Sequence, residues 1–264
     1  MSDKPTRHIL CLSGGKDSSA LAIYMRDRVP QMEYAFCDTG KELPETYEYL
    51  ARIEAYLGKP VIRLNSDRGF DHWLEIYGGY LPSSRMRWCT RQLKLKPFET
   101  YVGSDNVISY VGIRADEDRE GYISTKPNIK AVFPFREDGI VKADVVRILE
   151  ESGVGMPTYY EWRSRSGCYF CFFQQKNEWL GLRERHPELF EAARTYEKTD
   201  QETGQRYSWQ SGETLDELVE PTRVAEIQAK ANKPSPQRGG TLLSVLTDVD
   251  DEGDDDRPCL ICEL

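Results

Sequence analysis

Residues 12–19 have the sequence Leu-Ser-Gly-Gly-Lys-Asp-Ser-Ser and join an apolar run directly to a segment with helical spacing. Two adjacent glycines allow the backbone to bend with its N–H groups turned inward. The side chains of Ser13, Lys16 and Ser18 add donors near the positive N-terminal end of the following helix. The stretch therefore predicts a loop that binds a phosphate or another oxyanion.

The spacing of this loop differs from that of the Walker loop, which has four residues between its first glycine and its Gly-Lys pair. Residues 13–18 instead resemble the signature of the PP-loop ATP pyrophosphatases, the adenine nucleotide alpha hydrolases, which cleave ATP to AMP and pyrophosphate. The alternative is a Ser/Gly turn that only caps the helix and binds no ligand. The resemblance implies ATP as cofactor, held by Ser13, Gly14, Gly15, Lys16, Asp17 and Ser18.

The order of apolar segments predicts an α/β fold. Strands are expected at 8–12, 34–37 and 61–64, and helical patterns occupy the two intervals between them. This alternation predicts a doubly wound, mostly parallel, Rossmann-like sheet with ligands at the carboxyl ends of its strands. Further strands are expected at 106–111 and 131–135.

Composition divides the chain into three parts. We expect a nucleotide-binding α/β domain at 1–160, a cysteine-site and helical region at 161–231, and a linker, acidic run and cysteine-containing tail at 232–264. Residues 248–256 hold seven acidic and no basic side chains, and the rest carries 35 basic against 37 acidic ones. Because the acidity is local, a nucleic-acid partner stays open. Neither a long apolar run nor a secretory signal is visible, so a cytoplasmic protein with no membrane partner is expected.

Asp38 follows the second predicted strand and therefore shares an edge of the sheet with the loop. Asp17 and Asp38 could together hold a Mg²⁺ that shields a triphosphate, because Mg²⁺ prefers carboxylates and phosphate oxygens. The alternative is that Asp38 caps a turn. Residues 36–47, which contain Asp-Thr-Gly and Pro-Glu-Thr-Tyr, resemble a stretch of the PAPS reductase family, a branch of the same superfamily.

Residues 112–119, Gly-Ile-Arg-Ala-Asp-Glu-Asp-Arg, resemble another segment of the PAPS reductase group. That resemblance implies that Arg114 and Arg119 face the phosphates of the nucleotide. A guanidinium fork matches a phosphate bidentately, which agrees with this assignment. We expect Lys16, Asp17, Asp38 and Arg114 to be the catalytic residues.

Three of the seven cysteines lie in sequence patterns that indicate metal or redox chemistry. Cys168 and Cys171 form a Cys-x-x-Cys, and Cys89 lies in a basic segment at 85–97. Neighbouring cations predict a lowered pKa for the Cys89 thiol, whereas a solvated basic helix is the plain alternative. Metal or redox chemistry suits these cysteines better than disulfides in a reducing compartment.

The cysteine spacing resembles the pattern by which assimilatory sulfonucleotide reductases hold a [4Fe-4S] cluster. Trp88 replaces the first cysteine of that pattern, so a fourth thiolate is expected from Cys259 or Cys262. A Cys₄ Zn²⁺ site is the competing interpretation. Cys11 and Cys37 lie in apolar runs and are expected in the core.

The intact loop at 13–18, the Gly-Ile-Arg segment and the cysteine spacing together most resemble the ATP pyrophosphatases of DNA phosphorothioation systems, the DndC or SspD type. This resemblance implies DNA as acceptor, a cysteine desulfurase as sulfur donor, and other subunits of a modification complex as partners. APS or PAPS reduction and tRNA thiolation are alternatives within the superfamily. A nucleotide- or DNA-binding subunit without catalysis is the alternative outside it.

Overall fold

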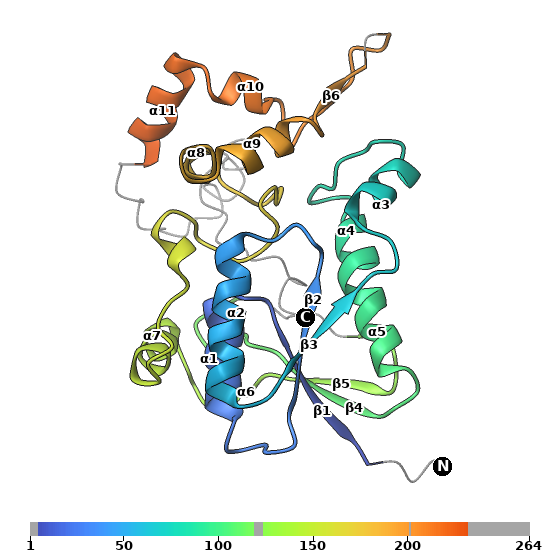
Figure 1. Cartoon of the computed structure of the whole chain (residues 1–264), viewed down its shortest axis with the longest axis vertical. Coiled ribbons are helices and arrows are strands. Elements are labelled where there is room, and N and C mark those ends of the chain that lie inside the picture. Colours follow the sequence, from blue (N-terminus) through green and yellow to red (C-terminus); the bar gives the residue numbers. More distant parts are fainter. Residues whose placement is uncertain (1–4, 119–123, 201, 232–264) are drawn as a thin grey trace, which may run out of the picture.

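The computed structural model describes residues 5–118, 124–200 and 202–231, and a five-stranded parallel sheet lies at its centre (Figure 1). The strand order is β3-β2-β1-β4-β5, and every pairing is parallel. The strands are β1 Arg7–Leu12, β2 Glu33–Asp38, β3 Val61–Asn65, β4 Val107–Tyr110 and β5 Ile129–Val132. Strand order reverses direction beside β1, so the carboxyl end of β1 is the topological switch point where such sheets bind ligands.

Helices cover both faces of this sheet, which confirms the doubly wound prediction. Leu10 and Leu12 of β1 belong to a core beneath three helices, α1 Lys16–Met25, α2 Pro44–Leu57 and α7 Lys142–Glu151. Ile9 and Cys11 point to the opposite face, where α5 Lys96–Val102 packs. The alternation follows from the two-residue period of a strand. Since both faces are covered, β1 is apolar at successive positions.

A third core joins the C-terminal region to the segment after β3. It contains Phe70, Trp88, Phe170, Trp179 and Trp209, all buried. The elements around this core are α3 Phe70–Ile76, α4 Trp88–Thr90, the π-helical η1 Arg91–Leu95, the 3₁₀ turn η2 Thr158–Glu161, α8 Lys176–Arg185, α9 Pro187–Arg194, β6 Lys198–Thr199, β7 Arg206–Tyr207, α10 Leu215–Leu218 and α11 Pro221–Ala231. Because this core takes residues from both sides of position 160, the predicted domain boundary there stays a prediction.

The last predicted strand lies slightly earlier in the chain than expected. The last strand of the sheet ends at Val132, and Pro134 begins the short helix α6 Pro134–Glu137. Proline lacks a backbone N–H and suits the first turn of a helix, which explains why the strand predicted at 131–135 stops early.

The described helices include none that is long and apolar enough to cross a membrane.

Gly14 occupies a position that no other residue fits. Its φ is +74°, and a Cβ there would lie 2.5 Å from Cγ2 of Thr46 on α2. Gly58 shares the left-handed conformation, with φ +63°, but has open space around it. Substitutions at the two glycines therefore distinguish the cost of backbone strain, present at both positions, from the cost of steric overlap, present only at Gly14.

We expect Gly58→Ala to lower the free energy of unfolding by about 1 kcal/mol, the cost of the left-handed conformation. Gly14→Ala should cost roughly 1–3 kcal/mol more, because Thr46 and the loop must move apart. Urea denaturation of the two variants measures the difference. Equal losses in the free energy of unfolding would mean that steric overlap with Thr46 adds no measurable cost.

Candidate functional site

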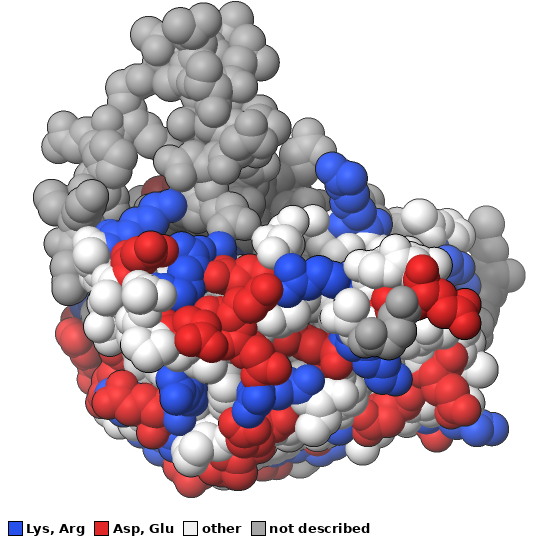
Figure 2. Space-filling view, turned by 90° about the horizontal axis from the view of Figure 1, so that it is seen from above, with Lys and Arg blue, Asp and Glu red and all other residues white. Residues whose placement is uncertain are grey.

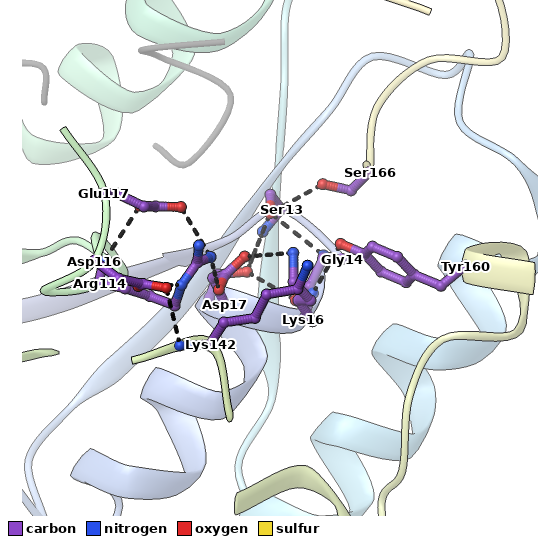
Figure 3. A network of polar contacts seen from close by, with 12 residues as sticks. Ser13, Gly14, Lys16, Asp17, Arg114, Asp116, Glu117, Lys142, Tyr160 and Ser166 are labelled. Atoms are coloured by element: carbon purple, nitrogen blue, oxygen red, sulfur yellow. Dashed lines mark hydrogen bonds and ion pairs between the residues drawn. The ribbon is translucent and has the colours of Figure 1, made fainter. Parts of the chain in front are cut away.

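The predicted anion loop lies at the carboxyl end of β1 and runs into the N-terminus of α1 (Figure 3). Its hydroxyl groups are turned inward: the Ser13 N–H donates to Ser18 Oγ over 3.1 Å, and the Gly15 N–H donates to Ser13 Oγ over 3.3 Å. Gly112, after β4, is pressed against the same loop, since a Cβ on it would lie 3.1 Å from the Asp17 carbonyl oxygen. The loop is thus held in shape by its own side chains and by the neighbouring strand.

A buried group of opposite charges stands beside the loop. Arg114 Nη1 lies 2.7 Å from one oxygen of Asp17, and Lys16 Nζ lies 3.0 Å from the other (Figure 3). Arg114 also pairs with Asp116 at 2.9 Å and with Glu117 at 2.8 Å. The structure therefore brings together Lys16, Asp17 and Arg114, three of the four residues predicted to be catalytic.

These carboxylates keep the two cations charged. Burial alone would lower the pKa of Arg114, but Asp17 and Glu117 outweigh it and raise the pKa above its ordinary value. Burial also lowers the pKa of Lys16, and Tyr160 and Asp17 together raise it above normal. Both side chains therefore stay positively charged beside a loop lined by hydroxyls and N–H groups, while Asp17, Asp116 and Glu117 pair with them.

Three residues outside the predicted site also touch the loop. The hydroxyl of Tyr159 donates to the Gly14 carbonyl over 2.7 Å, and the Tyr160 hydroxyl accepts the Lys16 N–H over 3.3 Å. The hydroxyl of Ser166 donates to Ser13 Oγ over 3.2 Å (Figure 3). No local sequence pattern marks these residues, because only folding brings η2 and its following loop onto the N-terminal part of the chain.

Asp38 lies at the carboxyl end of β2, as expected, but it is engaged in a turn. One of its oxygens accepts the Gly40 N–H over 2.9 Å and the Tyr47 hydroxyl over 2.8 Å. This is the turn-capping arrangement that was the alternative to a Mg²⁺ ligand. Across the described ranges, no three His, Cys, Asp or Glu side chains are placed to hold a metal ion, so the pairing with Asp17 on Mg²⁺ stays a prediction.

The structure gathers Cys89, Cys168 and Cys171 around one pocket. The pocket has a volume of about 470 Å³, including its open mouth, and Thr39 and Phe173 are also among its lining residues. Two segments far apart in the sequence are joined beside the pocket by backbone contacts. Residues 42 and 168 form an antiparallel bridge, and the Tyr169 N–H donates to the Lys41 carbonyl over 2.9 Å. Cys89 arrives from the start of the basic segment 85–97, 79 positions before Cys168.

Arg163 braces the loop that carries the Cys-x-x-Cys. Its side chain is only 2% exposed and donates to the carbonyls of Gly167, over 3.1 Å, and Cys168, over 2.8 Å. Arg163 is therefore a buried structural cation and is not part of the surface. Gly167 has a φ of +136°, which lets the loop turn just before the first cysteine.

Glu42 is a second residue that sequence reasoning missed. It is 7% exposed, its Oε1 accepts the Thr39 hydroxyl over 2.9 Å, and the same oxygen lies 3.7 Å from Cys168 Sγ. Burial first, and the Glu42 charge second, raise the pKa of the Cys168 thiol well above its ordinary value. The other Glu42 oxygen is buried without a hydrogen-bond partner, which is costly for a carboxylate. Its place in the Asp-Thr-Gly stretch at 36–47 was the available signal.

The three thiols are suitable donors for a cluster or Zn²⁺, but the described side chains form no assembled metal site. Cys259 and Cys262, the expected sources of a fourth ligand, lie outside the described residues, as does Arg119. The metal assignment therefore stays a prediction, and no chemical step below passes through a metal cluster. Cys11 and Cys37 are buried in the core beneath α5, as predicted.

The parallel sheet with an anion loop at its switch point defines an α/β nucleotide-binding domain. Residues 7–134 match the family model of the phosphoadenosine phosphosulfate reductase domain. The matched part, just under half of the chain, is thus similar to that domain.

Similar proteins span several activities. An uncharacterized protein of Methanocaldococcus jannaschii is 27% identical and aligns with 69% of this chain and 40% of its own length. The tRNA-specific 2-thiouridylase MnmA of a Psychrobacter species is 29% identical, over 58% of this chain and 39% of its own. The crystal structure of PAPS reductase from Candida auris in a phosphate complex covers 63% of this chain and 82% of that one, with 16% identity and a TM-score of 0.48. The chain thus spans well under two thirds of both sequence relatives.

We expect Arg114→Ala to lower the free energy of unfolding by roughly 3 kcal/mol, because it leaves Asp17 and Glu117 as buried carboxylates without their main cation. Arg147 is the matched control: it also faces two carboxylates, but its side chain is 57% exposed. Arg147→Ala should leave the free energy of unfolding nearly unchanged, because an exposed ion pair contributes little. Similar losses in urea denaturation would mean that the buried network contributes little.

Metal analysis of protein purified anaerobically tests the thiol pocket. We expect a brown protein with broad visible absorption that is lost in Cys89→Ser, Cys168→Ser and Cys171→Ser. Cys11→Ser, which alters a thiol in the core beneath α5, is the control and should keep the colour. A colourless protein with stoichiometric zinc would overturn the iron–sulfur prediction in favour of the Cys₄ zinc alternative.

Proposed function

We propose that this protein is an ATP pyrophosphatase that activates a nucleic-acid phosphate for sulfur incorporation, with the DNA backbone as acceptor. One observation carries the proposal: the anion loop with its two charged side chains, Lys16 and Arg114, is joined directly to a pocket of thiols. Ser166 contacts Ser13 of the loop, and Cys168, two residues further, lines the pocket. A phosphate-activating site and a sulfur-handling site would thus work side by side.

In the first step an oxygen of the acceptor phosphate attacks the α-phosphorus of ATP, and pyrophosphate leaves. The negative charge that grows on the pyrophosphate needs fixed positive charge more than it needs a base. Lys16 and Arg114 are the side chains for that task, with Mg²⁺ as a further counter-charge. Asp17 keeps both cations at the loop, as its two ion pairs indicate.

In the second step sulfur displaces AMP from the activated acceptor. A cysteine desulfurase would supply the sulfur as a persulfide, and a thiol reductant would then cleave the sulfur–sulfur bond to leave sulfur on phosphorus. Other subunits of a modification complex would present the DNA. The thiol pocket is the natural place for sulfur to arrive, because Cys168 follows two residues after Ser166, whose hydroxyl contacts Ser13 of the loop.

Two neighbouring activities are distinguished by the acceptor. Transfer of sulfur to a tRNA base is the second candidate, favoured by the 29% identity to a tRNA-specific 2-thiouridylase. Reduction of APS or PAPS agrees with the name of the matching family model. The complete Ser-Gly-Gly-Lys-Asp-Ser loop favours ATP cleavage, since APS and PAPS are already adenylated.

Anaerobic incubation with ATP, a cysteine desulfurase, a thiol reductant and DNA tests the proposal, with mass spectrometry of nuclease digests as the readout. We expect release of pyrophosphate and a dinucleotide that carries sulfur in its linkage. Lys16→Ala should lower the rate at least about 100-fold, as expected when a preorganised charge is lost. Lys142→Ala, a lysine on the neighbouring helix α7, serves as control.

Three other outcomes would contradict the proposed acceptor or reaction. Sulfur found in a base of added tRNA would establish the second candidate. Sulfite released from PAPS with thioredoxin, without pyrophosphate release from ATP, would establish the reductase. An unchanged cellular function in Lys16→Ala and Asp17→Ala would identify a binding subunit without catalysis.

A further inference from the structure

Tyr160 contacts Lys16 of the anion loop in two ways. Its hydroxyl accepts the Lys16 backbone N–H over 3.3 Å, and the Lys16 Nζ lies 5.1 Å from the centroid of its ring. In the view of Figure 3, Tyr160 and Arg114 lie on opposite sides of Lys16. One side chain from the 3₁₀ turn η2 therefore touches both the backbone and the ammonium group of this lysine.

The backbone contact involves the first N–H of helix α1. The first N–H groups of a helix have no acceptor within the helix, and Gly15, which precedes α1, has no side chain to cap them. Such groups, when they follow a glycine loop, donate to bound phosphates in many nucleotide-binding proteins. The Tyr160 hydroxyl thus occupies an acceptor position that a phosphate oxygen would take.

A phosphate on this N–H has to displace the hydroxyl, because one N–H serves only one acceptor well. The bond that would be lost is neutral and, at 3.3 Å, longer than the usual length of about 2.9 Å. The bond that would replace it is charge-assisted and roughly twice as strong as a neutral one. The exchange therefore favours the phosphate.

The ring of Tyr160 acts on the other end of Lys16. The Lys16 Nζ contacts this ring and also one oxygen of Asp17, which lies 3.0 Å away. Tyr159 stacks on Tyr160 with ring centroids 4.9 Å apart, and the Tyr159 hydroxyl donates to the Gly14 carbonyl over 2.7 Å. The packed ring can therefore restrict a lysine side chain that is flexible by itself.

Charge on the outer surface gives a phosphate little direction. On the face of the molecule in Figure 2, acidic and basic side chains are interspersed. A mixed surface of this kind produces no strong field of one sign. The immediate neighbours of Lys16 are therefore the groups that prepare the loop for an anion.

We propose that Tyr160 is a positioning residue of the nucleotide site. Its hydroxyl holds the Lys16 N–H until a nucleotide phosphate displaces it, and its ring restricts the movement of the Lys16 ammonium group. The inference rests on the proposed function, because it takes the ligand to be a nucleotide. It adds to that function a residue of η2, outside the anion loop and its neighbouring strands.

Isothermal titration calorimetry of the full chain with α,β-methylene-ATP, which cannot release pyrophosphate, tests the role of the hydroxyl. We expect Tyr160→Phe to bind this analogue about 2- to 5-fold more tightly than the unaltered protein, because no hydroxyl has to be displaced. Tyr159→Phe is the matched control. The hydroxyl that it removes donates to a carbonyl and competes with no phosphate, so this variant should not bind more tightly.

Equal or weaker binding by Tyr160→Phe would overturn the displacement. Weaker binding would show that the hydroxyl itself holds the nucleotide. Tighter binding by Tyr159→Phe to the same extent would also overturn it, because the effect would then not depend on the Lys16 N–H.

Tyr160→Leu tests the ring, and comparison with Tyr160→Phe isolates its effect, because both variants lack the hydroxyl. We expect Tyr160→Leu to bind the analogue about 3- to 10-fold less tightly than Tyr160→Phe, as the loss of a cation–π contact predicts. Tyr160→Met, a second variant without a ring, should behave alike. Thermal unfolding checks that the variants stay folded.

Tyr56→Leu is the matched control for the ring. Arg26 lies over the Tyr56 ring at 4.8 Å, near the end of α2, whereas the loop packs against Thr46 near the start of that helix. This variant should leave the affinity unchanged. Equal affinities of Tyr160→Leu and Tyr160→Phe, or an equal loss in Tyr56→Leu, would overturn the role of the ring.

The inference and the proposed function fail in different ways, because binding of the analogue requires no turnover. Tighter binding by Tyr160→Phe in a protein that never releases pyrophosphate from ATP would remove the proposed activity alone. Pyrophosphate release by a protein whose affinity does not respond to Tyr160→Phe would remove the inference alone. Absence of any binding to the unaltered protein would contradict both.

Discussion

The ion pairs of Asp17 hold the site together. One carboxylate, almost fully buried at the start of α1, bridges Lys16 of the loop and Arg114 from beyond β4. Without it, two cations would repel each other in a poorly hydrated place, and burial would drive the lysine toward its neutral form. The pair also joins two segments almost a hundred residues apart. Any phosphate that enters must therefore meet a charge arrangement that already exists.

Close packing of small residues makes this arrangement feasible. A methyl group at Gly14 would overlap Thr46, and one at Gly112 would lie tightly against the backbone of Asp17, which would have to shift by a few tenths of an ångström. Thr46 belongs to α2 and Gly112 follows β4, so the loop packs against two different elements around the sheet. A rigid loop of this kind costs little reorganisation when charge develops on a bound nucleotide.

The second half of the site comes from the region after residue 157. Tyr159, Tyr160 and Ser166 touch the loop, and Cys168 and Cys171 open into the pocket beside it. The proposed function would use this continuity, because nucleotide cleavage and sulfur chemistry would then need no large movement between them. Arg163 is buried in the same region, where it donates hydrogen bonds to the carbonyls of the cysteine loop.

Local patterns in the sequence determined most of the fold. Apolar runs, glycine pairs and prolines mark the parallel strands, the anion loop and the start of α2, because each depends on neighbours within a few positions. The loop residues, Arg114 and the three cysteines carried enough chemistry to be singled out in the same way. Tertiary structure alone decided that Asp38 caps a turn, that Glu42 faces Cys168, and that Arg87 and Arg165 share Phe173. The Glu42–Cys168 and Arg87–Phe173 contacts join residues far apart in the chain, which only the packing of the sheet, its helices and the aromatic core brings within reach of one another. The sequence offered the Asp38 turn as one of two alternatives, and the structure shows the turn.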